Sequence, residues 1–220
     1  MNGSLPLPLL QNVQIASPCH VRWEDMTGDE RTRQAFVIDP GDDADAILEA
    51  LEASRLQAKL ILATHAHLDH VMAVAQVREA TGATFMLHPA DAPLLAAMPV
   101  QARHFLGVEL PPPPPVDAWL TAGETVAIDD IPLKVLLTPG HSSGSVSFYW
   151  APPPGERGIV FSGDALFQGS IGRTDLGGDF PTLERSIRTQ LYTLPDDTVV
   201  LSGHGDATTI GREKRTNPFV

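Results

Sequence analysis

The sequence has one cysteine, Cys19, and few positive charges. Its 15 lysines and arginines face 27 aspartates and glutamates, which gives a formal net charge of -12. A single cysteine excludes an intrachain disulfide and fits a reducing compartment. The negative charge speaks against nucleic acid or an anionic membrane surface as a partner. No apolar run approaches the length of a transmembrane helix, so we expect no membrane partner.

Residues 1–10 carry no basic residue and contain Pro6 and Pro8, so they do not predict a secretory signal peptide. We therefore expect a soluble cytoplasmic protein. The 220 residues, of which 43% are hydrophobic, are enough for one sizeable core. We expect residues 1–220 to form a single domain. The sequence indicates nothing about the oligomeric state.

The most informative stretch is Thr-His-Ala-His-Leu-Asp-His at residues 64–70. It follows the apolar run 60–63, which predicts a buried strand, and it precedes residues 71–81, which predict a helix. A polar cluster of this density directly after a buried strand is not explained by packing. It predicts a metal site.

Two positions for metal ions follow from the spacing within this stretch. Residues two apart at the end of a strand face the same side, so His65 and His67 can bind one ion together. The chain then turns into the helix, so Asp69 and His70 point toward a second position a few ångströms away.

Other apolar patterns predict an alternation of strands and helices. The predicted strands are 13–21, 34–38, 84–87, 125–128, 133–137, 146–150, 158–161 and 198–201. The predicted helices are 42–56, capped by Asp42 or Asp43, then 89–97 and 182–191.

Between residues 98 and 118 these patterns fail. The run Pro111–Pro115 fits neither a helix nor a central strand, and it predicts a stiff polyproline-like surface loop. Because single-domain patterns continue on both sides, we interpret 98–118 as a proline-rich insertion and not as a domain boundary.

Three later strands also end in a small residue followed by a candidate ligand. His141 follows 133–137, Asp164 follows 158–161, and His204 follows 198–201. Loops at one edge of a sheet can bring such side chains together on a rigid frame. Combined with the stretch 64–70, these residues form a coherent set of ligands.

The complete set of motifs resembles the metallo-β-lactamase fold superfamily across residues 38–215. The matching motifs, in the family's order, are His-Ala-His-Leu-Asp-His at 65–70, Gly-His-Ser at 140–142, Gly-Asp at 163–164 and Gly-His-Gly at 203–205. The resemblance implies an α/β protein, a four-layer αββα sandwich with metals at one edge of its two sheets.

The resemblance also implies two divalent metal ions and assigns their ligands. The first ion would be held by His65, His67 and His141, the second by Asp69, His70 and His204, with Asp164 bridging. Imidazole and carboxylate ligands without a thiolate favour zinc and leave iron or manganese open. Such a pair lowers the pKa of a shared water to give a hydroxide nucleophile. Asp69 would be the catalytic residue that orients it.

Within the superfamily, residues 164–175 and the tail 207–218 are similar to the glyoxalase II, or hydroxyacylglutathione hydrolase, group. The tail is similar to its short bacterial members, which lack the C-terminal helical domain. This implies a metal-dependent hydrolase of a small-molecule thioester, with a glutathione conjugate, S-lactoylglutathione, as candidate substrate. The departing thiolate is a good leaving group and requires no dedicated general acid.

Residues around the expected substrate site match this group only in part. Arg173 stands where the group places a basic glutathione contact, and its guanidinium can hold a carboxylate bidentately. Alternatively, Arg173 pairs with Asp175 or Asp179 and shapes the loop. Two tyrosines of the group are replaced, one by Asp175 and one by the pair Gly205-Asp206. The hydrolytic set is therefore whole, and the substrate stays open.

Other activities share parts of this pattern. A persulfide dioxygenase would hold a single iron with His65, His141 and Asp164. We rank it second because Leu176-Gly177 stands where such enzymes carry an aromatic residue and glutamine. Lactonases and phosphodiesterases share the metal motif, and a β-lactamase is disfavoured because such enzymes are generally exported. The remaining candidate histidines, without a motif, are expected to be structural: His20, His88 and His104.

Overall fold

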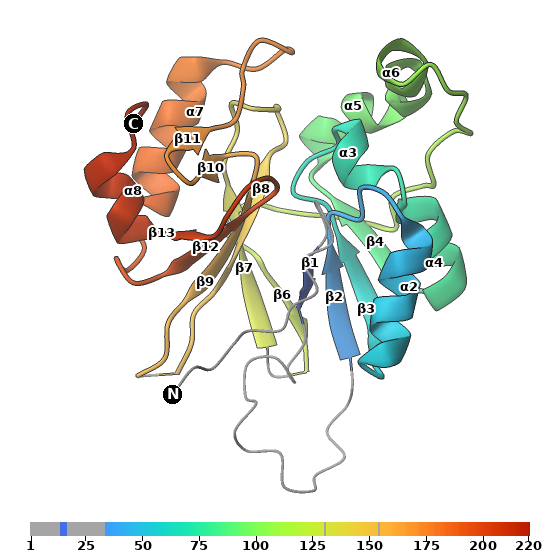
Figure 1. Ribbon diagram of the computed structural model, residues 1–220, viewed down its shortest axis with the longest axis horizontal. Coiled ribbons are helices and arrows are strands. Elements are labelled where there is room, and N and C mark those ends of the chain that lie inside the picture. The colour runs from blue at the N-terminus through green and yellow to red at the C-terminus, as the bar shows by residue number, and fades with distance from the viewer. Residues whose placement is uncertain (1–13, 17–33, 130, 154) are drawn as a thin grey trace, which may run out of the picture.

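Two mixed β-sheets lie face to face, and helices cover the outer face of each (Figure 1). The computed structural model describes residues 14–16, 34–129, 131–153 and 155–220. This order of layers, helix, sheet, sheet and helix, confirms the predicted α/β class and four-layer sandwich.

The first sheet has five strands in the order β1-β2-β3-β4-β5. β1 pairs antiparallel with β2, and the other neighbours pair parallel. The strands are β1 (Gln14–Ala16), β2 (Gln34–Ile38), β3 (Gln57–Leu62), β4 (Thr84–Leu87) and β5 (Ala118–Trp119).

The second sheet has six strands in the order β13-β12-β9-β8-β7-β6, with β12 and β9 parallel and the other pairs antiparallel. A separate hairpin, β10–β11, stands beside it. The strands are β6 (Thr125–Ile128), β7 (Ile131–Leu137), β8 (Val146–Trp150), β9 (Ile159–Gly163), β10 (Leu166–Phe167), β11 (Ser170–Ile171), β12 (Val199–Ser202) and β13 (Thr208–Thr209).

The helices divide between the two outer faces. Beside the first sheet lie α2 (Ala44–Ala53), α3 (Leu68–Val71), α4 (Val74–Thr81), η1 (Pro89–Asp91), α5 (Ala92–Ala96) and α6 (Met98–Phe105). Beside the second lie α7 (Phe180–Ser186), its π-helical continuation η2 (Ile187–Leu191) and α8 (Ile210–Thr216). Among the described residues, no helix has both the length and the apolar character needed to span a membrane.

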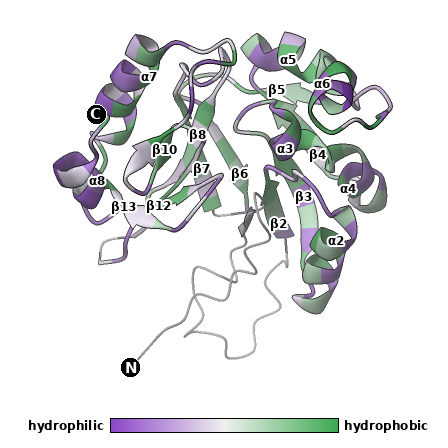
Figure 2. Cartoon of the chain, turned by 45° about the horizontal axis from the view of Figure 1, so that its top comes forward, coloured by the Kyte–Doolittle hydropathy of each residue, from purple (hydrophilic) through white to green (hydrophobic). Residues whose placement is uncertain are grey.

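Alternating side chains of the strands build three apolar layers. In β2, Phe36 and Ile38 face the space between the sheets, whereas Ala35 and Val37 face the helices. This follows from the two-residue period of a strand, and both faces are apolar because both are covered. A third layer lies between the second sheet and α7, η2 and α8. In Figure 2 the central strands are mainly hydrophobic, while the surrounding helices carry hydrophilic stretches.

The expected single helix at 71–81 is wrong in two respects. The chain becomes helical already at Leu68, in α3, and α4 begins only at Val74. The backbone N–H of Ala73 donates to the carbonyl of Pro40 at 3.0 Å instead of continuing the helical ladder. This contact with the loop after β2 divides the helix, and a pattern in the local sequence does not reveal it.

The irregular stretch is also shorter than expected. Residues 98–105 form α6. Its residues Met98 and Ala102, four residues apart, are buried in the apolar layer between the first sheet and its helices. Residues 118–119 form β5, so only 106–117 lie outside regular elements. Asp117 closes this segment by accepting hydrogen bonds from the Phe85 amide and the Arg78 guanidinium. That the proline-rich stretch is an insertion stays a prediction.

Two further boundaries differ. The helix expected at 182–191 begins at Phe180, because Asp179 caps it by accepting a hydrogen bond from the Thr182 amide. Of the first expected strand, 13–21, the structure describes 14–16 as β1, and the rest lies outside the described residues. The cap at Asp43 is confirmed, since its carboxylate accepts from the Ala46 amide.

Replacing Leu183 of α7 tests the third apolar layer. The side chain is fully buried, so Leu183→Ala should lower the free energy of unfolding by about 2–5 kcal/mol, measured by urea denaturation. Val100→Ala, at a side chain that is 71% exposed, should change it by less than about 0.5 kcal/mol. Equal losses in both variants would contradict the assignment of this layer.

Candidate metal centre

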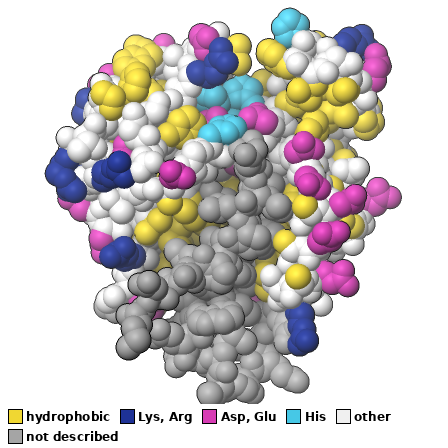
Figure 3. Space-filling view, viewed as in Figure 1, with side chains coloured by type: hydrophobic (Ala, Val, Ile, Leu, Met, Phe, Trp, Pro, Cys, Tyr) yellow, Lys and Arg dark blue, Asp and Glu magenta, His cyan; other side chains and the backbone are white. Residues whose placement is uncertain are grey.

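The carboxyl ends of β2, β3, β7, β9 and β12 meet at one edge of the sandwich, and each leads into a loop with a polar side chain. The two sheets are joined there by a hydrogen bond of 2.8 Å from the Val146 amide to the Thr64 carbonyl. Figure 3 shows histidine side chains beside acidic ones between the two halves of this edge. The loops of both sheets therefore open onto a common site.

The first group of donors contains His65, His67 and His141, whose candidate ligand atoms lie within 4.8 Å of one another. The Nε2 atom of His141 lies 3.1 Å from Nε2 of His65 and 2.8 Å from Nδ1 of His67. The structure thus brings together the three residues expected to hold the first ion, although His141 is more than 70 residues away in the sequence.

The second group contains Asp69, His70 and His204. Oδ2 of Asp69 lies 3.1 Å from Nε2 of His204 and 3.8 Å from Nε2 of His70. The His70 side chain is fully buried, whereas those of Asp69 and His204 are about half exposed, at 53% and 42%. The second group therefore faces solvent, and the first is more enclosed.

Asp164 lies between the two groups. Its Oδ1 is 3.4 Å from Nε2 of His70, and its Oδ2 is 3.4 Å from Nε2 of His204 and 3.6 Å from Nε2 of His141. It forms a third potential metal-binding group with His65 and His70. All seven expected ligands therefore meet, and the division between two ions with Asp164 bridging stays a prediction.

Hydrogen bonds fix the orientation of two histidines of the first group. Nδ1 of His141 lies 2.7 Å from the carbonyl oxygen of Arg173, which can only accept, so this nitrogen carries the proton. Nδ1 of His65 lies 3.1 Å from the hydroxyl of Thr64, whose own proton goes to Asp39 at 2.6 Å. In both rings Nε2 is therefore left with its lone pair.

This arrangement fits a cation. Two nitrogen lone pairs, on His65 and His141, face each other at 3.1 Å and repel unless a positive charge lies beside them. Nε2 of His70 and Oδ1 of Asp164 are also buried without a hydrogen-bond partner. Buried polar atoms normally have partners, so these unsatisfied atoms indicate a place for bound metal.

The pKa values of His65 and His67 agree with such a site, whereas Asp39 and Asp164 outweigh burial and raise the pKa of His70 well above 6.5. Burial lowers the pKa of His65 well below 6.5 and that of His67 to about 4, so both are neutral ligands at pH 7. Burial alone would raise the pKa of Asp164, but contacts with His204 and His70 outweigh burial and lower the pKa. Hydrogen bonds to Asp164 and Asp69 raise the pKa of His204 to about 9. A proton and a metal ion therefore compete for His204.

Asp39 supports the site, although it is not among the ligands expected from the sequence. It follows β2 directly and is nearly fully buried. Its carboxylate accepts hydrogen bonds from the amide and hydroxyl of Thr64, both at 2.6 Å, and contacts Nδ1 of His70 at 3.0 Å. Metal-binding histidines commonly have such a carboxylate partner. The sequence signal that could have revealed this role is the position of Asp39 directly after a buried strand, which it shares with Asp164.

Asp91 is a second supporting carboxylate without a sequence signal. It accepts hydrogen bonds from the Ala66 amide at 3.0 Å, the Ser142 hydroxyl at 2.8 Å and the Gly144 amide at 2.6 Å. It thereby joins the loop that carries His65 and His67 to the loop that carries His141. No local pattern marks this role, because its partners are 25 to 53 residues away.

The guanidinium of Arg173 pairs with Asp175 at 2.6 and 2.7 Å, as the second interpretation of the sequence expected. Both side chains are more than half exposed. Only the backbone carbonyl of Arg173 contacts the site, through His141. Contact between the Arg173 side chain and substrate stays a prediction.

The histidines without a motif that the structure describes lie outside the three metal-binding groups. Nδ1 of His88 accepts a hydrogen bond from the Ala90 amide, which caps η1. His104 is exposed on α6 and stacks edge-on against Phe105. His20 lies outside the described residues.

Comparison with known proteins agrees with the fold and the donor set. A sequence model described as Metallo-beta-lactamase superfamily matches residues 30–204. The chain belongs to this superfamily. Its donor groups therefore stand in a family of metal-dependent enzymes, as the motifs indicated.

Relatives in this superfamily differ in their described activities. The chain is 39% identical to "Hydroxyacylglutathione hydrolase GloC" of Haemophilus influenzae, over 92% of each chain. The solved structure of BLEG-1, a B3 metallo-beta-lactamase, shares 38% identity with a TM-score of 0.81, and 98% of this chain and 97% of that chain align. TTHA1623, solved in a di-iron-bound form, shares 43% identity with a TM-score of 0.74, over 84% and 89% of the chains.

Asp39→Asn tests whether the supporting carboxylate orients His70. An amide cannot accept from the amide and hydroxyl of Thr64 and from His70 together, so metal affinity should fall about 10- to 100-fold. Asp42→Asn is the matched control, because the exposed Asp42 accepts only from its neighbour Asp43 among the hydrogen bonds described. Affinity is measured by competition with a chromogenic chelator. Equal affinities in the two variants would contradict the role of Asp39.

Proposed function

We propose that this member of the superfamily is a hydrolase of glutathione thioesters, with S-lactoylglutathione as its representative substrate. The observation that carries the proposal is the 39% identity to a hydroxyacylglutathione hydrolase over 92% of both chains. The complete set of donors at the sheet edge supports it. A reducing cytoplasm, which contains glutathione, is the compartment we propose.

The donor set matches the chemistry of ester-like hydrolysis. Two divalent cations bound there would supply an activated water and polarise the carbonyl that it attacks. Zinc is the ion we propose, because the donors are imidazoles and carboxylates without a thiolate. The half-exposed carboxylate of Asp69 lies on the open side, 3.1 Å from His204, where it can orient the attacking water. The departing thiolate requires no proton donor.

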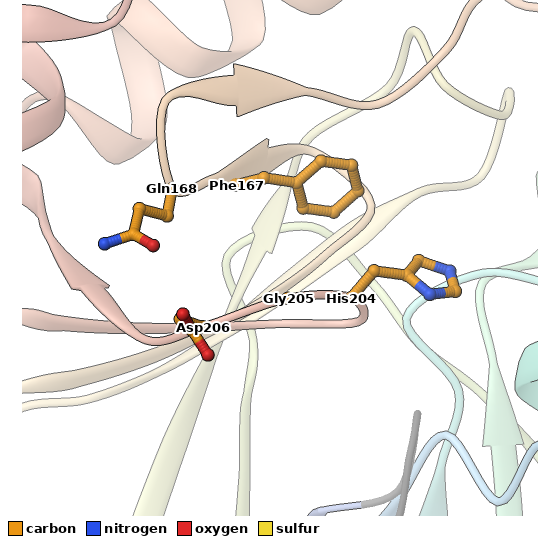
Figure 4. A pocket seen from close by; sticks show the side chains of 5 residues that line it. All are labelled: Phe167, Gln168, His204, Gly205 and Asp206. Carbon is orange, nitrogen blue, oxygen red and sulfur yellow. The ribbon is translucent and has the colours of Figure 1, made fainter.

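A pocket of about 400 Å³ adjoins the open side of the metal centre and offers a place for the substrate. It is lined by Phe167, Gln168, His204, Gly205 and Asp206 (Figure 4). The ring centroids of Phe167 and His204 are 6.1 Å apart, so an apolar wall stands beside a candidate ligand. The substrate would lie here with its scissile carbonyl toward the donors.

Hydrolysis of a β-lactam, which the sequence alone disfavoured, becomes the second candidate in place of the dioxygenase. It is favoured by the 38% identity and near-complete overlap with BLEG-1. Opening a β-lactam ring needs the same activated water and polarised carbonyl, so the metal centre alone does not separate the two activities. The residues that line the pocket must therefore select between the two substrates, and a direct assay of both substrates tests which one is preferred.

The purified protein should contain about two metal ions per chain and release thiol from S-lactoylglutathione. We expect a larger kcat/KM for this thioester than for a chromogenic β-lactam, and loss of both activities after chelation. Faster opening of the β-lactam would favour the second candidate. One iron per chain, with oxygen consumption on glutathione persulfide and no thiol release, would replace the proposal by the dioxygenase.

Asp69→Asn tests the catalytic role of this residue. Loss of the carboxylate charge should lower kcat at least about 100-fold with little change in KM, because the contribution is made in the transition state. Metal content is measured on the same samples to separate loss of orientation from loss of an ion. Asp45→Asn, an exposed aspartate of α2, is the control and should keep full activity. Unchanged kcat in Asp69→Asn would exclude the role.

A further inference from the structure

Glu213 of α8 is a fully buried carboxylate outside the metal centre. It accepts three hydrogen bonds, from the Gly169 amide at 2.8 Å, the Thr208 hydroxyl at 2.5 Å and the Asn217 side-chain amide at 3.0 Å. A buried carboxylate is costly unless it is fully paired, so this one is tied closely to its surroundings. Neither the metal chemistry nor the apolar core requires it.

One side of this contact is the hairpin β10–β11, which provides a wall of the pocket. Phe167 pairs with Ser170, so Gln168 and Gly169 form a two-residue turn, with Gly169 at a φ of 67°. Phe167 and Gln168 line the pocket. Two residues of the C-terminal segment contact this hairpin: Glu213 accepts from the Gly169 amide of the turn, and Asn217, directly after α8, donates to the Ser170 carbonyl of β11 at 3.0 Å.

The other side of the contact is the segment between β12 and β13, which provides the opposite wall. His204, Gly205 and Asp206 of this segment line the pocket, and it ends at Thr208. The hydroxyl of Thr208 donates to Glu213. One carboxylate therefore links the hairpin wall to the wall that carries His204.

We propose that Glu213, assisted by Asn217, is a positioning residue that fixes the two walls of the substrate pocket relative to each other. It acts through Gly169 and Thr208 and touches neither the metal ligands nor the substrate. The proposal rests on the proposed function for the identity of the substrate, whose apolar part next to the scissile bond lies against Phe167. Without Glu213 the Gly169 amide loses its buried acceptor, and the hairpin moves away from His204.

The test compares wild type with Glu213→Ala, Glu213→Gln, Arg212→Ala and Leu51→Ala. Glutamine can still accept from Gly169 while its NH₂ group donates to Thr208, so it is the conservative rescue. Arg212 is an exposed neighbour on α8. Leu51 of α2 is buried in the apolar layer between the first sheet and its helices, which includes no residue of the pocket, so its loss destabilises the fold without touching the pocket. Measurements are amide hydrogen exchange of residues 166–171, metal content, and kcat and KM for S-lactoylglutathione.

Glu213→Ala should speed exchange at 166–171 and raise KM about tenfold, with kcat within about twofold and unchanged metal content. Glu213→Gln and Arg212→Ala should match wild type, and Leu51→Ala should lower Tm while KM and exchange at 166–171 stay unchanged. The proposal is overturned if Glu213→Ala leaves exchange at 166–171 unchanged, or speeds it without raising KM. It is also overturned if Leu51→Ala reproduces both effects. Absence of thiol release by wild type contradicts only the proposed function, and the exchange comparison still decides whether Glu213 holds the walls.

Discussion

The metal centre depends on the hydrogen bonds that the buried carboxylate of Asp39 makes across the first sheet. This residue directly follows β2 with a positive φ of 52°, and its carboxylate reaches Thr64 after the neighbouring strand. It accepts from the amide and hydroxyl of Thr64 and contacts Nδ1 of His70. The hydroxyl of Thr64 in turn contacts Nδ1 of His65. One carboxylate therefore orients a histidine of each donor group.

Three buried carboxylates fix the loops around the metal centre by accepting hydrogen bonds. Asp39 orients ligands directly, Asp91 joins the two loops that carry the first group, and Glu213 links the walls of the pocket. Each accepts at least one hydrogen bond from a segment 25 or more residues away in the sequence. Loops have little regular structure of their own, so their positions must be fixed by such contacts. The structure is thus a rigid sandwich whose functional edge is held by buried acids.

Close packing at this edge also explains why a glycine, Gly203, precedes the candidate ligand His204. A side chain at Gly203 would bring its Cβ within 2.4 Å of Oδ1 of Asp164 and 2.5 Å of Cε1 of His70. Only glycine leaves room for these two candidate ligands to approach, so the Gly-His pattern at 203–204 has a steric cause. The same patterns of glycine and ligand at strand ends had indicated from the sequence that the four segments meet.

The sequence by itself determined the position of most of the longer strands and, through the resemblance of its motifs to a known superfamily, the class of fold and the seven candidate ligands from His65 to His204. It could do so because strand periodicity and the spacing within residues 64–70 are local properties of the chain. The tertiary structure decided what depends on distant contacts: the division of the helix at Ala73, the helix at 98–105, and the roles of Asp39 and Asp91. These features arise where a hydrogen bond or buried face joins residues far apart in the sequence, and no local pattern records such a partner.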